Sequence, residues 1–349
     1  PPPPEFDFRN EILKSSAATV AEFHPELLDL AEAGNLVLVR KSQYGPVPTW
    51  RSEFVEPEAI WIVGTSHISQ ESCSHVERVI KAVRPDNVVV ELCRSRQVYD
   101  SFSFLFNRAG IMYSDENEKQ QLKSNLFSLT GTKFFATLSR SINLGGQTAL
   151  ALRLLLATVS SKLSQQPFGI EFSAARKAAE EIGAQLVLGD RPIEITLERA
   201  WRALSWKEKL NLVSTIVTVI ITSSQASMNT PQQESSSRNG ELRLYEQLSI
   251  TYPSLLAPMI HERDVFIAWS LKRSKAVERS SRVVGIVGKG HMNGVVYALI
   301  SDQGNHLRFR DLAGNRPGSD SGWAVSVLRS LLRDTLVGIV LWVLYQQLK

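Results

Sequence analysis

The sequence predicts an α/β fold with a central, mostly parallel sheet that is flanked by helices. Four short apolar runs, rich in β-branched residues and bounded by Gly, Pro, Asn or Asp, are typical of buried strands. These runs are residues 60–63, 88–92, 185–188 and 283–287. Helical apolar stripes separate several of them, and strands that alternate with helices indicate a layered α/β domain.

Three stripes of apolar residues at helical spacing support this prediction. The first, residues 76–83, lies between the first two strands and ends before Pro85. This strand–helix–strand unit predicts parallel strands and a right-handed crossover. The second stripe covers residues 172–182, where Gly183 fits a C-terminal cap, and the third covers residues 197–204.

Composition and missing motifs limit the class of protein. Of the 349 residues 43% are hydrophobic and 21% charged, which excludes a disordered chain. The net charge of +4 is too small to indicate nucleic-acid binding, so no nucleic-acid partner is expected. Two cysteines cannot form a disulfide scaffold, so we expect a reducing compartment. The sequence contains no phosphate-binding loop, no Gly-x-Ser-x-Gly elbow and no His-Glu-x-x-His motif.

We divide the chain into three parts. Residues 1–55 form a partly flexible leader with a helix near 25–33 and a strand at 36–40. Residues 56–312 form the α/β domain, with a helical insertion after the second strand. The stretch 223–240 is rich in Ser, Gln and Asn, which predicts a disordered surface loop.

The third part, residues 313–349, contains a hydrophobic helix. Residues 335–348 carry no charged side chain. As a helix they span about 21 Å, less than the roughly 30 Å bilayer core. Local thinning and snorkelling of Arg333 and Lys349 would still let them insert. We therefore expect a C-terminal membrane anchor; the alternative is a helix that packs one apolar face on the domain.

Two Gly-x-x-His turns carry the main chemical signal. His67 follows the first strand and His291 follows the last one, each three residues after a glycine. Ligands bind outside the carboxyl ends of the strands in open α/β sheets, and glycine lets the backbone turn sharply there. Both histidines are therefore candidate ligands, and the alternative is two structural loop or capping residues.

The second strand ends in Glu91, inside an apolar run where an unpaired carboxylate is costly. Pairing with Arg96 is the structural explanation. Metal ligation or general-base catalysis is the functional one, and the two are compatible. The adjacent Cys93 is either a soft ligand or a small buried residue.

Other charged residues lie near the predicted sheet edge. Glu171 opens a helix, where the helix dipole favours a carboxylate. Asp190 and Arg191 follow the third strand and either brace the site or tie a turn. The charged run at 261–264 begins another helical pattern, and such clusters are commonly caps or solvated faces.

Six motifs in order make the chain similar to the TraB/PrgY family. That family is related to the Tiki metalloproteases and more distantly to erythromycin esterase-like and ChaN-like proteins. The motifs span residues 58–300 and comprise the two Gly-x-x-His turns, Glu91-Leu92-Cys93-x-x-Arg96, Gly169-Ile170-Glu171-Phe172, residues 183–199 and Glu262-Arg263-Asp264.

The resemblance implies a Tiki-like fold and a metal-dependent, peptidase-like hydrolase acting on a peptide or protein. Its metal ligands would be His67, His291 and Glu91, holding a divalent Mn, Co or Zn ion that activates water. General-base catalysis and orientation of carboxylates or substrate would fall to Glu91, Glu171, Arg96 and Arg191.

The resemblance also implies a non-enzymatic alternative, because some plant-type members are associated with organelle membranes and with tethering or receptor roles. The chain would then act at mitochondria–ER contacts or in mitophagy, with a degenerate site. Either way we expect it on an organelle membrane facing the cytosol, most plausibly the mitochondrial outer membrane. The chloroplast and the soluble cytosol are the alternative locations.

Overall fold

One five-stranded sheet organises the structure. The computed structural model describes residues 1–45, 53–66, 70–93, 170–211, 214, 251–301 and 309–313. The strands in this part are β1 (Leu36–Arg40), β2 (Ala59–Thr65), β3 (Asn87–Val90), β4 (Gln185–Leu188) and β5 (Arg282–Gly288). Their order is β1-β2-β5-β3-β4, and only the β1–β2 pair is antiparallel. The predicted mostly parallel sheet is confirmed.

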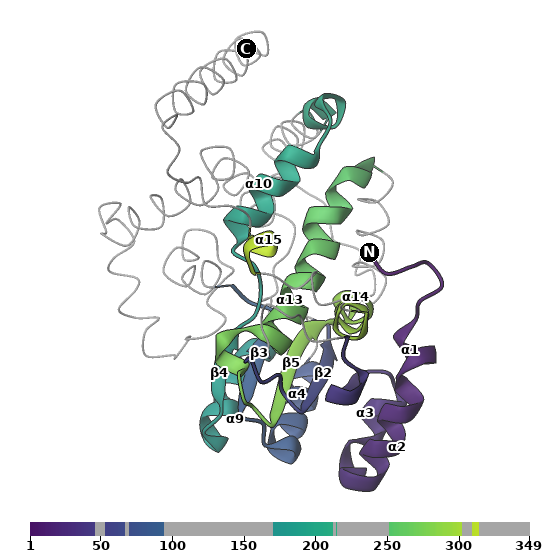
Figure 1. Ribbon diagram of the computed structural model, residues 1–349, viewed down its shortest axis with the longest axis vertical. Helices are drawn as coiled ribbons and strands as arrows, with labels where there is room; N and C mark the ends of the chain where they lie inside the picture. Colours follow the sequence, from purple (N-terminus) through teal and green to yellow (C-terminus); the bar gives the residue numbers. More distant parts are fainter. Residues whose placement is uncertain are drawn as a thin grey trace, which may run out of the picture.

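Helices cover both faces of this sheet (Figure 1). One face packs against α2 (Leu13–Phe23), α3 (Leu28–Glu32), α4 (Gln70–Val83) and α9 (Ile170–Ile182). The other packs against α1 (Phe8–Glu11), α13 (Glu262–Arg273) and α14 (Lys289–Ile300). The described part also contains α10 (Ile193–Ala203), α15 (Phe309–Ala313), the short helices η1 (Pro25–Leu27), η2 (Lys41–Gln43), η5 (Pro253–Leu255) and η7 (Lys275–Val277), and the π-helical turn η6 (Ala257–His261).

Two hydrophobic cores lie on opposite faces of the sheet. In β5, Val284 and Ile286 belong to the core beneath α4 and α9. Val283 and Val287 point the other way, into the core beneath α13 and α14. Because both faces are buried, the strands are continuous apolar runs, and this made them visible in the sequence.

The last strand within the described residues, β5, occupies the middle of the sheet. The sequence predicts a β2–α4–β3 unit, and the two strands do run parallel, but β5 lies between them. Val284 faces Trp61 of β2 on one side and Val88 of β3 on the other. The turn after β5 therefore stands beside the ends of both β2 and β3.

Element boundaries follow the sequence closely, with one correction at the site. The helices predicted at 76–83 and 172–182 are α4 and α9, and Gly183 ends α9 with a φ of 74°. The strand predicted at 88–92 ends at Val90 instead. The N–H of Leu92 donates to the carbonyl of Val90 at 2.7 Å, so the chain turns and Glu91 stands at the sheet edge.

Residues 1–45 join this same fold. The predicted strand at 36–40 is β1, which forms the edge of the sheet beside β2. Phe8 and Val20, from the preceding helices, are almost completely buried, and each lies in one of the two cores. The N-terminal helices therefore close the sheet at its antiparallel edge.

Several predicted features lie outside the described residues. These are His67, Arg96, the helical insertion, the loop at 223–240 and the hydrophobic segment 335–348. Within the described ranges, every helix is too short or too polar to cross a bilayer.

Candidate functional site

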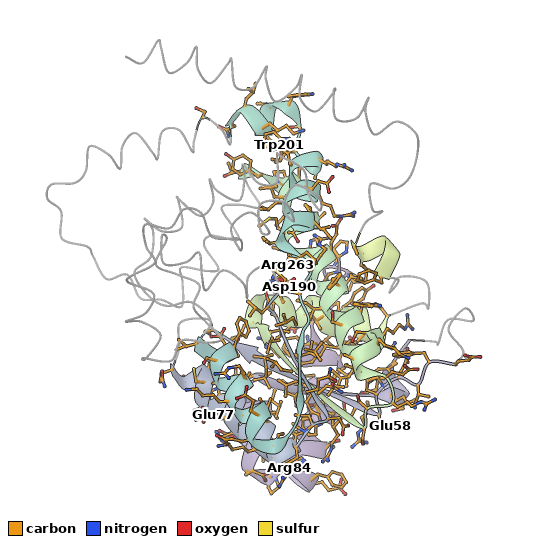
Figure 2. All side chains as sticks on the ribbon, turned by 90° about the vertical axis from the view of Figure 1, so that its left-hand side faces the viewer. Glu58, Glu77, Arg84, Asp190, Trp201 and Arg263 are labelled. Carbon is orange, nitrogen blue, oxygen red and sulfur yellow. The ribbon has the colours of Figure 1, made fainter. Side chains whose placement is uncertain are left out.

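A cluster of charged side chains lies at the carboxyl edge of β3, β4 and β5. The first turns of α13 and α14 meet the sheet there, and Figure 2 labels Asp190 and Arg263 next to each other at this edge. We call this group the edge cluster; its members are Glu91, Asp190, Arg263, Asp264 and His291.

Glu91 is the central carboxylate of the edge cluster. Its backbone N–H still bonds the carbonyl of Ile286 at 2.9 Å, which extends the β3–β5 ladder and fixes its position. Its Oε2 accepts the N–H of Gly288, the N-cap of α14, at 2.8 Å. Its Oε1 lies 2.6 Å from Arg263 Nη2 and 3.3 Å from His291 Nε2. Only 4% of the residue is exposed, so these partners stand where water would otherwise solvate the carboxylate.

His291 lies in the first turn of α14 and is held by Asp264 of α13. Its Nδ1 is 2.6 Å from Asp264 Oδ1, and both residues are buried. Gly294 makes this contact possible, since a Cβ there would stand 1.9 Å from Asp264 Oδ2. A carboxylate accepts hydrogen bonds, so this pairing assigns the ring hydrogen to Nδ1 and directs Nε2 towards Glu91.

Arg263 joins the carboxylates of neighbouring strands. Its Nε and Nη2 donate to Asp190 at 3.1 and 2.9 Å, while Nη2 also donates to Glu91. Burial alone would lower the pKa of Arg263, but the charges of Asp190 and Glu91 outweigh burial and raise it. The arginine therefore remains charged. Three carboxyl groups face this one guanidinium and one imidazole, and burial raises the pKa of one of them, Asp264.

The pKa of His291 is raised above its ordinary value. Burial, the largest single effect, lowers it, but the charge of Glu91 and the hydrogen bond to Asp264 together outweigh burial. The imidazole is thus more basic than a free histidine, and a cation at Nε2 would compete with a proton for that nitrogen.

Arg191 lies near the edge cluster but faces elsewhere. Its backbone N–H donates to Asp190 Oδ1 at 2.7 Å, whereas its side chain is fully buried against α13 and η6. The guanidinium donates to Glu262 at 2.6 Å and to the carbonyl of Pro258 at 2.7 Å. Arg199 binds the same Glu262 carboxylate. This arginine–glutamate network joins α10 to the start of α13.

Glu171 lies on α9 and Cys73 lies on α4, whereas Cys93 lies beside the edge cluster. Glu171 lies in the first turn of α9, as predicted, and it is fully buried. Burial, and then the charge of Glu171, raise the pKa of the Cys73 thiol on α4. Cys93 is also buried, two residues after Glu91.

The structure thus brings together two of the predicted site residues, Glu91 and His291. Arg263 contacts Glu91, the interaction that we expected of Arg96, which lies outside the described residues. The sequence interpretation missed Arg263 and Asp264, which looked like a helix cap or a solvated face. The usable signal was that the run from Glu262 to Asp264 opens a helix whose next residues are strongly apolar.

Comparison with known proteins now identifies the family. The sequence model of the TraB/PrgY/gumN family matches residues 48–305, about three quarters of the chain. The chain belongs to the TraB/PrgY/gumN family. This match includes every member of the edge cluster and excludes residues 1–47.

Relatives extend the similarity beyond that family segment. The human TraB domain-containing protein is 27% identical over 92% of this chain and 84% of its own length. The bovine protein of the same name is 26% identical over 99% of this chain and 90% of its own length. An uncharacterised protein of Methanocaldococcus jannaschii is 28% identical over 72% of this chain and 56% of its own length.

Proposed function

We propose that this TraB-family chain is a metal-dependent hydrolase of peptide bonds whose site is the edge cluster. The observation that carries the proposal is the 3.3 Å separation of Glu91 Oε1 and His291 Nε2, two buried donors of metal-ligating type. Their elements are 200 residues apart in the chain, so only the folded sheet edge brings these atoms together.

The donor set suits a divalent ion. Two ligands at about 2.0–2.1 Å from one tetrahedral ion lie about 3.4 Å apart, close to the Glu91–His291 distance. A metal-binding histidine ordinarily donates its other ring N–H to a carboxylate, and for His291 this acceptor is Asp264. His67 would be the third ligand, because Gly288, which precedes the His291 turn, pairs with Thr65 of β2, two residues before His67. Within the described ranges alone, no three such residues form a complete set.

The positively charged Arg263 stands where the ion would bind, so the proposal requires this guanidinium to move. Its Nη1 is 3.3 Å from His291 Nε2 and its Nη2 is 2.6 Å from Glu91 Oε1, so the guanidinium bridges the two donors. Asp190 also holds it, and a small rotation towards Asp190 would free Oε1 without leaving the arginine unpaired. The released charge would stand beside the site, where it can bind a substrate carbonyl oxygen or stabilise a developing oxyanion.

The chain's own groups would divide the remaining work. A bound divalent ion would supply an acidified water and a polarised carbonyl. Glu91, held by the Gly288 N–H, is placed to accept a proton from a nucleophilic water. Asp264 keeps the His291 ring oriented throughout. The buried setting excludes bulk water and strengthens each of these charge interactions.

The test is metal content together with cleavage. Purified protein, stripped and then incubated separately with Mn²⁺, Co²⁺ and Zn²⁺, should retain near-stoichiometric metal and cleave an unstructured protein such as casein. Glu91→Gln and His291→Asn should lose both properties. His75→Asn is the matched control, because His75 also lies on a helix near a carboxylate, Glu71 at 3.5 Å, but not in the edge cluster. Wild-type protein that retains no metal would overturn the proposal.

We propose membrane attachment through residues 335–348 as a separate property, on the mitochondrial outer membrane. The apolar, charge-free composition of this segment supports it. Deleting residues 334–349 should release folded protein from membranes into the soluble fraction. If the full-length protein is instead washed off by carbonate, attachment by this segment is wrong. A non-enzymatic tether would still attach to membranes through this segment, but its edge cluster would retain no metal.

A further inference from the structure

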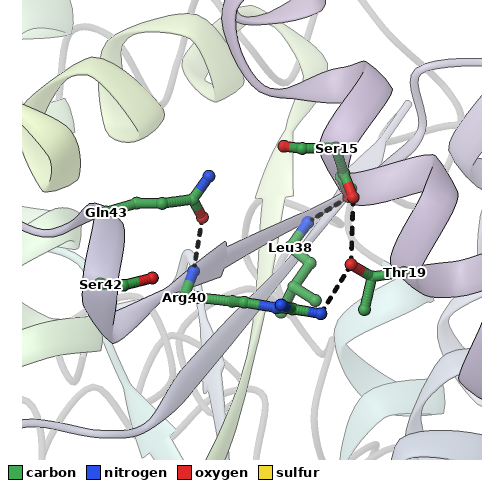
Figure 3. A pocket seen from close by; sticks show the side chains of 7 residues that line it. Ser15, Thr19, Leu38, Arg40, Ser42 and Gln43 are labelled. Carbon is green, nitrogen blue, oxygen red and sulfur yellow. Dashed lines mark hydrogen bonds between the residues drawn. The ribbon is translucent and has the colours of Figure 1, made fainter.

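A small polar pocket lies on the far side of the molecule from the edge cluster. β1 runs antiparallel to β2, so Arg40 at its end pairs with Ala59 at the start of β2, the edge opposite Glu91 and His291. The pocket opens between this strand end and α2 (Figure 3). Its lining residues are Ser15, Ser16, Thr19, Leu38, Arg40, Ser42 and Gln43.

Arg40 is positioned across this pocket by neutral groups. Its backbone N–H donates to Gln43 Oε1 at 2.8 Å, and its Nη2 donates to Thr19 Oγ1 at 2.7 Å. The Thr19 hydroxyl donates its hydrogen to the carbonyl of Ser15 at 3.0 Å, so the Thr19 oxygen accepts the hydrogen bond from Arg40. Figure 3 draws these bonds around the open centre of the pocket.

The charge of Arg40 is not balanced by a carboxylate. Glu58 forms an ion pair with the neighbouring Lys41 at 2.6 Å, and no Asp or Glu lines the pocket. By contrast, the half-buried Arg78 binds Asp29 through two hydrogen bonds. Arg40 is an exposed residue that lines this pocket, and within the described part of the chain it has no ion pair.

Unused donors surround this charge. The other N–H groups of the Arg40 guanidinium, the amide NH₂ of Gln43 and the hydroxyl of Ser42 all remain available for hydrogen bonds with a ligand. The pocket volume is about 140 Å³, several times the roughly 30 Å³ that one water occupies in the liquid. It can therefore hold a tetrahedral oxyanion with several acceptor oxygens.

We propose that this pocket binds a phosphoryl group, as a phosphate monoester or a phospholipid headgroup. Arginine's planar fork matches phosphate oxygens in pairs, and the Gln43 and Ser42 donors would serve the oxygens that remain. The pocket lies wholly within residues 15–43, outside the family match at 48–305. It is therefore a property of the N-terminal part of this chain and independent of the proposed hydrolase.

Inorganic phosphate is the first probe. Full-length protein should gain thermal stability with increasing phosphate at constant ionic strength, because a ligand that binds only the native state stabilises it. Arg40→Gln should weaken the apparent affinity by about tenfold or more, as expected when a charge-assisted hydrogen bond is lost. Thr19→Val, which removes the acceptor that holds Arg40, should weaken it less. Arg282→Gln, at an exposed arginine on β5, is the matched control and should bind as the wild type does.

Two further arms identify the source of the phosphoryl group. Glycerol 3-phosphate tests soluble esters, and phosphatidylcholine vesicles with and without phosphatidic acid test headgroups; binding in either arm must require Arg40. Acetate at matched ionic strength should have no effect. Equal responses of the wild type and Arg40→Gln, equal responses to acetate and phosphate, or no response to phosphate would each overturn the proposal.

Discussion

The carboxylate of Asp264 influences the protonation of the His291 imidazole. It contacts Nδ1 at 2.6 Å, and its hydrogen bond is one of the effects that raise the pKa of the imidazole. The ring is almost completely buried, so few other groups can replace this contact. Asp264, 27 positions away on another helix, therefore acts together with Glu91 on the protonation of His291.

Asp264→Asn should lower the pKa of His291. The amide preserves the shape of the carboxylate but removes its negative charge, so the protonated imidazole loses a stabilising partner. The imidazole proton resonances of His291, followed by NMR from pH 5 to 9, measure the shift. Asp29→Asn, which changes an exposed carboxylate paired with Arg78, is the control. An unchanged midpoint in Asp264→Asn would contradict this role.

Gly294 is required because it leaves room for Asp264. Adding a methyl group 1.9 Å from Asp264 Oδ2 forces the two helices or the carboxylate to move. Gly294→Ala should therefore destabilise the protein by about 1–3 kcal/mol, measured by urea unfolding. The cost should shrink when Asp264→Ala is already present, since the two closest atoms, Oδ2 and Cγ, are gone and only Cβ at 3.0 Å remains. An equal cost in both backgrounds would show that another contact is responsible.

At the scale of elements, the arginine–glutamate network fixes α10 against α13. Glu262 binds Arg191 and Arg199 together, and Arg191 also bonds Thr196 at 3.0 Å. Burial would raise the pKa of Glu262, but these two arginines outweigh burial and lower it. The folded state therefore holds the ionised carboxylate more tightly than the unfolded state does.

This difference gives the network a defined pH dependence. A folded-state pKa below the unfolded value means that the contribution is complete above about pH 4.3 and disappears as the pH falls through the folded value. Glu262→Gln should cost about 1–3 kcal/mol at pH 7, and the gap to the wild type should close in the acid range. Glu180→Gln, at an exposed glutamate that pairs with the half-buried Arg176, should cost about 0.5 kcal/mol or less. A gap that stays constant down to pH 3 would contradict the assignment.

At the scale of the whole molecule, residues 1–45 complete the domain. β1 covers the edge of β2, while the side chains of Phe8, Val20 and Leu36 are buried in the two cores. Without them β2 becomes an exposed edge strand with apolar faces, a structure that promotes aggregation.

Deletion of residues 1–45 should therefore prevent stable folding. We expect loss of the cooperative thermal transition by circular dichroism and elution as aggregates by gel filtration. Removing residues 1–4 alone is the control and should leave both measurements unchanged, because the first buried side chain is Phe8. A monomeric, cooperative protein after the larger deletion would show that β2 tolerates exposure.

The sequence alone determined the layered α/β fold and two members of the edge cluster. Strands buried on both faces are visible as apolar runs, and the carboxyl ends of parallel strands share one edge. Residues that directly follow such strands, like Glu91 and His291, could therefore be assigned to a common site without coordinates.

Only the tertiary structure decided which partners complete that site. Chain order does not reveal that β5 inserts between β2 and β3, because strand order depends on how the sheet assembles. Arg263 and Asp264 lie on a helix, and the packing of α13 against α14, made possible by Gly294, carries them to the sheet edge. Helical periodicity specifies which side of α13 is apolar, but not which buried charge its first turn will meet.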